Sequence, residues 1–301
     1  MQKDLIITGC SGFVGSNLIS RLSTENFNII GIDSKPPQKK IKEFIQISLK
    51  DLELNELKQI FDGKPIIHLA AVSNSKDCEN DLLQAFQSNC MDLIKIVEAS
   101  NQVNSRLIFS SSEWVYPSIK TRNIQVETDE VYMTTGMNTY AATKLLGELI
   151  IKRKSKKFDI LRFGIIYGKR FPAISAVEDI VFKCVSDEKI QIGSYKTARR
   201  FIYVEDIVDG LLQVIKKEPS NEIYNLTGSQ LVTLYEIIKI CQQILSKSLN
   251  VEVKNEIQNI RNPLPDKFYE KFDWNNSTSI QQGVKNLCEY YAKHLSEIQR
   301  H

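Results

Sequence analysis

Tyr140 and Lys144 stand four residues apart, a spacing that places a phenol and an ammonium group one above the other on one face of a helix. A lysine cation close to a phenol stabilises the phenolate and lowers the phenol pKa from its usual value of about 10. Such a pair can give and take a proton near neutral pH. Tyr140 is therefore a candidate general acid or base.

Two other pairs have the same spacing, so the spacing alone is weak evidence. They are Tyr116 with Lys120 and Tyr235 with Lys239. Pro117 makes the first pair a poor helix interior, and the second lies in a late amphipathic stretch. Tyr140 remains the candidate of chemical interest.

A serine cluster supplies a possible partner. Ser110, Ser111 and Ser112 follow the apolar run 106–109, at the carboxyl end of a predicted strand, where open α/β sheets hold their ligands. A hydroxyl there could hydrogen-bond the substrate oxygen that Tyr140 protonates or deprotonates. The alternative is that these serines only cap the end of the strand.

His68 is one of three histidines and ends the apolar run 65–67. Catalytic work by a histidine needs an identifiable partner, and neither a Ser-His-Asp set nor a metal-ligand set can be built around it. We interpret His68 as a packed, hydrogen-bonded core residue, and no metal site is predicted.

A glycine-rich turn, Thr8–Gly15, follows an apolar run and precedes an amphipathic stretch. Between a parallel strand and a helix, the backbone N–H groups of such a turn and the helix dipole bind phosphate. Gly9 allows a sharp turn, Gly12 a close approach of pyrophosphate, and Gly15 close packing of helix on strand. The turn predicts a dinucleotide site, although an ordinary glycine-rich turn has similar spacing.

Asp33 ends a second apolar run, 27–32, at the position where a carboxylate would bind the adenosine ribose hydroxyls. The same carboxylate repels a 2′-phosphate, so NAD is favoured over NADP. The nearby Lys35 weakens this preference slightly.

The elements that must position these residues alternate along the chain. Apolar runs at 44–47, 65–71, 106–109 and 158–163 predict strands, and helical patterns lie at 52–61, 79–100 and 138–154. This alternation predicts an α/β fold, a doubly wound parallel Rossmann sheet with a smaller C-terminal substrate lobe. We expect an NAD-binding domain at 1–165 and a mainly substrate-binding lobe at 166–301, with some later segments returning to the sheet.

Composition limits the functional classes. The 301 residues are 42% hydrophobic with a net charge of +3, and no basic tract is interleaved with aromatics, so no nucleic-acid partner is expected. The lysine-rich run 152–157 is interpreted as a solvated helix end. Six cysteines without close pairing suggest a reducing compartment. With neither a signal peptide nor a membrane-length apolar run, we expect a cytoplasmic protein without membrane association.

Together these motifs resemble the extended short-chain dehydrogenases/reductases of the NAD-dependent epimerase/dehydratase family, which modify nucleotide sugars. The matching positions are Thr8–Gly15, Asp33, His68–Ala71, Asn89, Ser110–Tyr116, Tyr140–Lys144, Arg162–Gly168 and Arg199–Asp206.

The resemblance implies a role for each matching position. The catalytic residues would be Ser112, Tyr140 and Lys144. The cofactor would be NAD, held by Gly9, Gly12, Phe13, Val14, Gly15, Asp33, Leu49, Leu69, Ala70, Ala71, Ser110, Tyr140 and Lys144. The substrate, a nucleotide-diphosphate sugar, would contact Ser73, Ser112, Glu113 and Arg199. A homodimer packed through helices that include the one bearing Tyr140 is also implied.

Three departures from the family pattern concern the substrate and the cofactor. Trp114 stands where the sugar dehydratases and decarboxylases have an acidic group, which argues against those reactions and leaves Glu113 as a possible substrate contact. Ser48 replaces an adenine-contacting Asp, so Leu49 and the backbone would keep that contact. Ile165 replaces an Asn that touches the diphosphate in many members.

Arg199 matches the family's diphosphate-binding arginine, whose planar guanidinium suits a bidentate contact. Arg200 is the alternative ligand. A structural ion pair with Glu205 or Asp206 is the simpler interpretation for either arginine.

The sequence favours an NAD-dependent nucleotide-sugar epimerase in carbohydrate biosynthesis, acting at C4 by removing and returning a hydride through a keto-sugar. The same residues would serve a nucleotide-sugar 4-dehydrogenase or a keto-sugar reductase. A non-catalytic NAD(H)-sensing protein on this fold is a third possibility.

Overall fold

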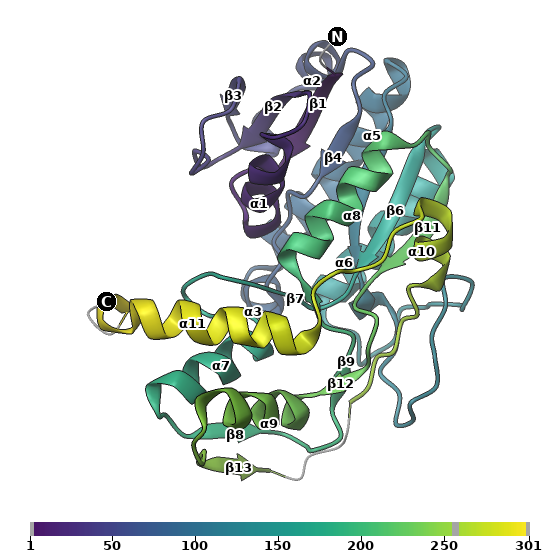
Figure 1. Cartoon of the computed structure of the whole chain (residues 1–301). Helices are drawn as coiled ribbons and strands as arrows, with labels where there is room; N and C mark the ends of the chain where they lie inside the picture. The colour runs from purple at the N-terminus through teal and green to yellow at the C-terminus, as the bar shows by residue number, and fades with distance from the viewer. Residues whose placement is uncertain (1–2, 255–258, 299–301) are drawn as a thin grey trace. The chain divides into compact units, whose positions relative to one another are not determined.

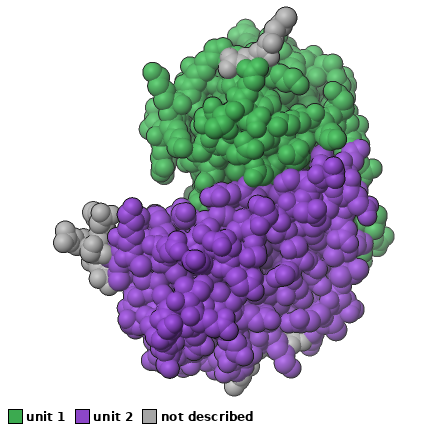
Figure 2. All heavy atoms as spheres, in the orientation of Figure 1, with its two compact units in different colours: residues 1–117, 127–163, 208–225 green, residues 118–126, 164–207, 226–301 purple. Residues whose placement is uncertain are grey.

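The computed structural model describes residues 3–254 and 259–298, which divide into two units (Figure 2). Unit 1 comprises residues 1–117, 127–163 and 208–225, and unit 2 comprises residues 118–126, 164–207 and 226–301. Each unit has its own hydrophobic core. The chain therefore returns to the first unit after leaving it at Phe163.

Unit 1 is built on a seven-stranded sheet with the order β11-β6-β5-β4-β1-β2-β3 (Figure 1). Its strands are β1 (Lys3–Thr8), β2 (Phe27–Asp33), β3 (Glu43–Gln46), β4 (Ile66–His68), β5 (Leu107–Ser112), β6 (Phe158–Phe163) and β11 (Glu222–Leu226). The pairs from β3 through to β6 are parallel. The predicted doubly wound parallel sheet is confirmed, and its strand order reverses beside β1, where such sheets bind ligands.

Helices cover both faces of this sheet. They are α1 (Phe13–Leu22), α2 (Leu54–Phe61), α3 (Ser75–Asn80), α4 (Leu82–Phe86), α5 (Asp92–Gln102), α6 (Thr139–Lys154) and α8 (Val204–Lys216), with the single turns η1 (Leu49–Asp51), η2 (Gln87–Met91) and η3 (Glu113–Val115). Helix α5 packs against both α2 and α6, whereas α1 is joined to α8 by the Arg21–Asp209 ion pair.

The helix predicted over 79–100 is interrupted. Asp81 leaves the helical region, with φ −137° and ψ 86°, and its carboxylate accepts the N–H of Gln84 at 2.9 Å. It thereby ends α3 and caps the start of α4. A π-turn, Gln87–Met91, then leads into α5. Local side-chain capping overrides the helical periodicity here.

Unit 2 is a set of helices with short strand pairs. Its helices are α7 (Ala176–Ser186), α9 (Leu234–Leu245), α10 (Asp266–Phe272) and α11 (Ile280–Ile298), and its strands are β7 (Ile166–Tyr167), β8 (Ile190–Ile192), β9 (Ala198–Arg199), β10 (Ile202–Tyr203), β12 (Val232–Thr233) and β13 (Val251–Val253). The helices α7, α9 and α11 pack together around one core. Within the described part of the chain, no helix is both long enough and apolar enough to cross a membrane.

Candidate active site

The glycine turn connects β1 to α1 as predicted. Gly9 has φ +70°, and a Cβ atom on it would lie 2.5 Å from the backbone nitrogen of Ala70. A Cβ atom on Gly15 would collide with the carbonyl oxygen of Gly9. Helix α1 starts after Gly12 with no side chain capping it, so its N-terminal dipole faces the turn uncompensated by a side chain. The turn therefore fits a dinucleotide pyrophosphate.

Asp33 lies at the end of β2, beside this turn. One carboxylate oxygen accepts the N–H of Ser11 at 3.0 Å and the other accepts the N–H of Lys35 at 3.1 Å. A carboxylate has about four acceptor positions, so Asp33 fixes the turn and retains capacity for ribose hydroxyls. This geometry suits the predicted contact with NAD.

The end of β4 lies against the glycine turn. The N–H of Leu69 donates to the carbonyl oxygen of Thr8 at 3.1 Å, and the Thr8 hydroxyl is 2.7 Å from Nδ1 of His68. His68 is buried and stacks on Phe109. Burial, together with the Lys144 charge, lowers the pKa of His68 to about 3. The sequence predicted a packed, hydrogen-bonded core histidine, and the burial of His68 and its contact with Thr8 agree with that.

The remaining predicted cofactor and substrate contacts of this region are placed as follows. Leu49 is buried in the core of unit 1, and its carbonyl oxygen accepts a hydrogen bond from Lys95 at 2.9 Å. Lys95 also bonds the carbonyl oxygens of residues 50 and 52, a role that no sequence spacing indicated. Ala71 is half-buried after β4, and Ser73 is exposed in the loop before α3.

Ser112, Tyr140 and Lys144 come together in unit 1. Tyr140 and Lys144 lie one turn apart on α6, with the Lys144 Nζ atom 5.9 Å from the centre of the Tyr140 ring. Nζ donates to the backbone oxygen of Ser110 at 2.8 Å, and the Ser112 side chain lies close enough to Tyr140 to lower its pKa. The Ser112 hydroxyl also accepts the N–H of Trp114 at 3.2 Å. Ser112 therefore caps the strand end and contacts the phenol.

The electrostatics of this group differ from the expectation drawn from spacing alone. Burial raises the pKa of Tyr140 to about 12, and the neighbouring Ser112 side chain acts in the opposite direction. Burial likewise lowers the pKa of Lys144 to about 8. The pKa shift of Tyr140 is therefore set by desolvation and not by the charge of Lys144, which the spacing led us to expect.

Asn89 and Cys78 both bond the backbone of Val72, in the segment that follows β4, and Asn89 also links that segment to α6. The Asn89 amide accepts the N–H of Val72 at 2.8 Å and donates to the carbonyl oxygen of Val72 and to the Thr143 hydroxyl, both at 3.0 Å. Cys78, buried on α3, donates to the carbonyl oxygen of Val72 at 3.3 Å. It also lies near enough to Tyr140 to contribute to the raised pKa of the phenol. Asn89 belonged to the recognised motif, whereas nothing in the sequence pointed to Cys78.

A buried polar network joins α6 to strands β5 and β6. Glu148 accepts two hydrogen bonds from Arg162, at 2.9 and 2.7 Å, and one from the Ser111 hydroxyl. The Arg162 guanidinium lies 4.7 Å from the centre of the Tyr116 ring, and the Tyr116 hydroxyl donates to Asn225 at 2.9 Å. Tyr116 therefore has a structural role, in line with its rejection as the proton carrier.

The other rejected pair is also structural. The Tyr235 ring packs edge-on against Tyr195, with the ring centres 4.7 Å apart, and the Lys239 ammonium lies 4.8 Å from the centre of the Tyr235 ring. A cation over an aromatic face is a packing interaction. Tyr140 and Lys144, by contrast, lie beside Ser112 at the end of β5, in the sheet that also carries the glycine turn.

Glu113 and Arg199, the two charged residues predicted to contact substrate, are both buried. The Glu113 side chain is fully inaccessible and directly follows Ser112. Arg199 belongs to unit 2, where its guanidinium donates to the carbonyl oxygen of Ala198 at 2.8 Å and to the Asn259 side chain at 2.6 Å. Both remain predicted substrate contacts.

Arg200 and Asp206 have structural partners in unit 2. Arg200 donates to the Asn262 side chain at 2.7 Å and to the carbonyl oxygen of Ser229. Asp206 accepts hydrogen bonds from the N–H and hydroxyl of Ser277, at 2.8 and 3.0 Å. These contacts fix the segments around β10 and α8.

Comparisons with known proteins identify the family of the chain. The model of the NAD dependent epimerase/dehydratase family matches residues 5–227. The chain is 24% identical to Protein CapI of Staphylococcus aureus, covering 97% of this chain and 99% of the relative.

Solved structures share the fold. A UDP-N-acetylglucosamine 4-epimerase from Methanobrevibacter ruminantium, in complex with UDP-N-acetylmuramic acid, has a TM-score of 0.84 at 21% identity, covering 97% of this chain and 99% of that one. The UDP-glucose 4-epimerase of Thermus thermophilus, in complex with NAD, has a TM-score of 0.80 at 19% identity, covering 96% and 98%. The family match over residues 5–227 shows that the chain belongs to the NAD-dependent epimerase/dehydratase family of enzymes, which use NAD and act on nucleotide sugars.

Proposed function

We propose that this protein is a nucleotide-sugar epimerase that inverts a carbinol carbon, C4, through a keto-sugar. The observation that carries the proposal is the group formed by Ser112, Tyr140 and Lys144. The Tyr140 phenolate accepts the proton of the C4 hydroxyl, and the Ser112 hydroxyl orients the same oxygen. Bound NAD would supply the acceptor, and later the donor, of the hydride, and its positive charge would favour the phenolate form of Tyr140. The 4-epimerases among the relatives support the choice of C4.

Trp114 supports epimerisation over elimination. Dehydration and decarboxylation in this family use an acidic side chain two positions before the tyrosine of the Val115-Tyr116 pair, and an indole cannot exchange that proton. With Ser112, Tyr140 and Lys144 intact, what remains is oxidation at a carbinol carbon and its reversal. Asp33 favours NAD over NADP, which suits an enzyme that recycles its cofactor within one turnover.

The test of the catalytic assignment is Tyr140→Phe. Loss of a general acid–base group lowers turnover by about 10²–10⁴-fold or more, while NAD binding persists because the glycine turn is unchanged. Tyr235→Phe, at a tyrosine with the same spacing to a lysine, is the matched control and keeps wild-type turnover. Interconversion of UDP-sugar epimers is followed by NMR without an added redox partner. Near-normal turnover of Tyr140→Phe would sink the assignment.

Cofactor retention distinguishes the epimerase from a dehydrogenase or reductase built on the same residues. The protein is purified without added cofactor and denatured, and the released dinucleotide is quantified with its redox state. Near-stoichiometric NAD is expected for an epimerase that keeps its cofactor through the cycle. A protein purified empty, which binds NAD(H) weakly, would instead point to net oxidation or reduction.

We also propose a homodimer that buries one face of α4, α5 and α6. Leu83 is 86% exposed, and other large apolar side chains on these helices and the π-turn between α4 and α5 are exposed as well. They are Leu82, Phe86, Met91, Ile94 and Leu149. Helices α4 and α5 both contact α6, so the residues share one region of unit 1. The resemblance implied dimerisation through the helix that bears Tyr140, and this face includes it.

A further inference from the structure

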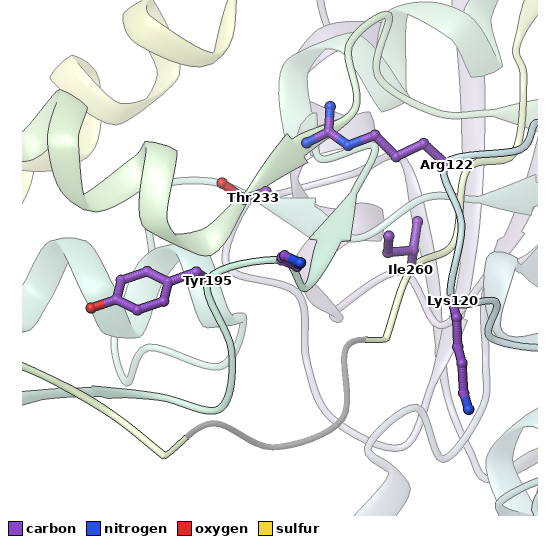
Figure 3. A pocket seen from close by; sticks show the side chains of 6 residues that line it. Lys120, Arg122, Tyr195, Thr233 and Ile260 are labelled. Atoms are coloured by element: carbon purple, nitrogen blue, oxygen red, sulfur yellow. The ribbon is translucent and has the colours of Figure 1, made fainter.

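A groove in unit 2 has a volume of about 340 Å³ (Figure 3). Its lining comes from four segments that are distant in sequence. They are the stretch 118–126, the loop between β8 and β9, strand β12, and the residues around Ile260. The six lining residues are Lys120, Arg122, Tyr195, Lys196, Thr233 and Ile260.

The groove lies on the opposite face of the small strand pair from Arg199. Thr233 is the register partner of Ala198, and Ile260 forms a bridge with Ala198 on its other side. Register partners project to the same face, and successive residues of a strand project to opposite faces. Arg199, paired with Val232, therefore projects away from the groove, which is distinct from the predicted diphosphate contact.

The groove is cationic. Lys120, Arg122 and Lys196 are exposed, and none of the six described residues that line it is acidic. Thr233 is the N-cap of α9, and its hydroxyl and the Glu236 carboxylate form a capping box that satisfies the N–H groups of both residues. One carboxylate is close: Glu236 accepts the N–H and hydroxyl of Thr233 at 2.6 and 2.8 Å. Arg122 and Lys196 thus supply the positive charge inside the groove, with Glu236 as the nearby carboxylate that the structure describes.

Aromatic and apolar surface completes the groove. The Tyr195 ring is half exposed and is held edge-on by Tyr235. Ile260 is buried in the groove's lining. Figure 3 shows the Arg122 side chain extending toward the strand of Thr233, whereas Lys120 points away from it and so lies at the rim. The charged and apolar parts together match a ligand with an anionic group and a compact organic part.

We propose that this groove binds a small organic phosphate, with the phosphoryl group on Arg122 and Lys196, and the organic part against Tyr195 and Ile260. The site requires neither NAD nor a nucleotide sugar, so it stands apart from the proposed catalytic function. A phosphoryl group can belong to a soluble metabolite or to a lipid headgroup. The small volume of the groove favours the soluble ligand.

The test measures binding of ribose 5-phosphate and inorganic phosphate to the full chain by isothermal titration calorimetry at low salt. Arg122→Ala and Lys196→Ala each weaken both ligands by about twofold to fivefold, the effect of one exposed charge pair. Tyr195→Ala removes the advantage of ribose 5-phosphate over inorganic phosphate. Glu236→Gln keeps a capping box, since glutamine also serves there, and tightens binding by a similar factor.

Lys293→Ala is the matched control, because it removes one exposed cation from α11 of the same unit. The Lys293→Ala variant is expected to bind both ligands with wild-type affinity. The proposal is overturned if neither ligand binds at millimolar concentration, if Lys293→Ala weakens binding as much as Arg122→Ala, or if Arg199→Ala or saturating NAD abolishes it. Flotation with phosphatidylglycerol vesicles tests the lipid source, and vesicle binding without binding of the soluble ligands overturns the assignment to a small molecule.

Discussion

His68 makes the stability of unit 1 sensitive to acid in a way that can be calculated. The ring is 1% exposed, its Nδ1 atom is 2.7 Å from the Thr8 hydroxyl, and Phe109 stacks on it. Burial and the Lys144 charge lower the pKa of His68 from 6.5 to about 3. The folded protein therefore keeps this imidazole neutral throughout the mildly acidic range.

The sign and size of the effect follow from proton linkage. Between pH 6.5 and about 3, the unfolded chain binds one proton at His68 that the folded chain does not. Because the unfolded state binds more protons, stability falls as the pH falls, by about 1.4 kcal/mol per pH unit. At about pH 4.5 the loss relative to neutral pH is about 3 kcal/mol.

The assay compares urea unfolding of the wild type and His68→Asn near pH 7.5 and near pH 4.5. Asparagine can still accept the Thr8 hydroxyl but does not titrate. The chain has two tryptophans, so a Trp274→Phe background leaves Trp114 to report on unit 1. The variant is less stable at both pH values, yet it loses about 3 kcal/mol less than the wild type on acidification.

A histidine elsewhere supplies the control. His294 on α11 is only half-buried, and its ring bonds the carbonyl oxygen of Tyr290 at 2.8 Å. Because His294 belongs to unit 2, His294→Asn should leave the unfolding of unit 1, as reported by Trp114, unchanged at both pH values. If His68→Asn and the wild type lost the same free energy between the two pH values, His68 would not be neutral in the folded protein, and the reasoning from its burial would be refuted.

Two further predictions concern the cofactor and the dimer. Asp33→Asn removes the carboxylate that repels a 2′-phosphate, so the ratio of NAD to NADP affinity falls at least about fivefold, or about 1 kcal/mol; fluorescence titration with both cofactors measures it, and an unchanged ratio would show that Asp33 does not face the ribose. Leu83→Glu places a charge on the exposed face of α4, and sedimentation equilibrium is expected to show a monomer where the wild type is a dimer. Lys293→Glu, on α11, should leave the dimer intact, and a wild type that sediments as a monomer would contradict the proposed interface.

Much of unit 1 could be predicted because each of its signals is local. Apolar runs define buried strands, and Thr8–Gly15 combines a strand, a turn and a helix start within a few residues. The grouping of Tyr140, Lys144 and Ser112 could also be predicted, because these residues belong to motifs near the ends of a strand and a helix. The break at Asp81 could not be read from periodicity, because a single side-chain cap decided it.

The contacts that hold the site in place join residues far apart in sequence. Lys95 reaches the carbonyl oxygen of Leu49 across 46 residues, and Asn89 reaches Thr143 across 54. No spacing rule predicts such pairs, since the fold alone brings them together. The pKa of Tyr140 is of the same kind, because it depends on burial that only the assembled unit creates.

Helix α6 shows why motif and periodicity gave different information. Its buried side carries Thr143, Lys144 and Glu148 among its apolar residues, so its hydrophobic pattern is weak although it lies against the sheet. Each of the three is satisfied there: Thr143 by Asn89, Lys144 by the backbone of residue 110, and Glu148 by Arg162.

A buried ion pair contributes little net stability, and breaking one by removing a single partner costs about 3–5 kcal/mol. Glu148 and Arg162 are therefore better explained by position than by stability. They fix α6 against β5 and β6, one turn beyond Lys144. A helix whose buried face carries polar groups departs from the usual apolar pattern of buried helix faces. Such departures are expected where a site must be held in place.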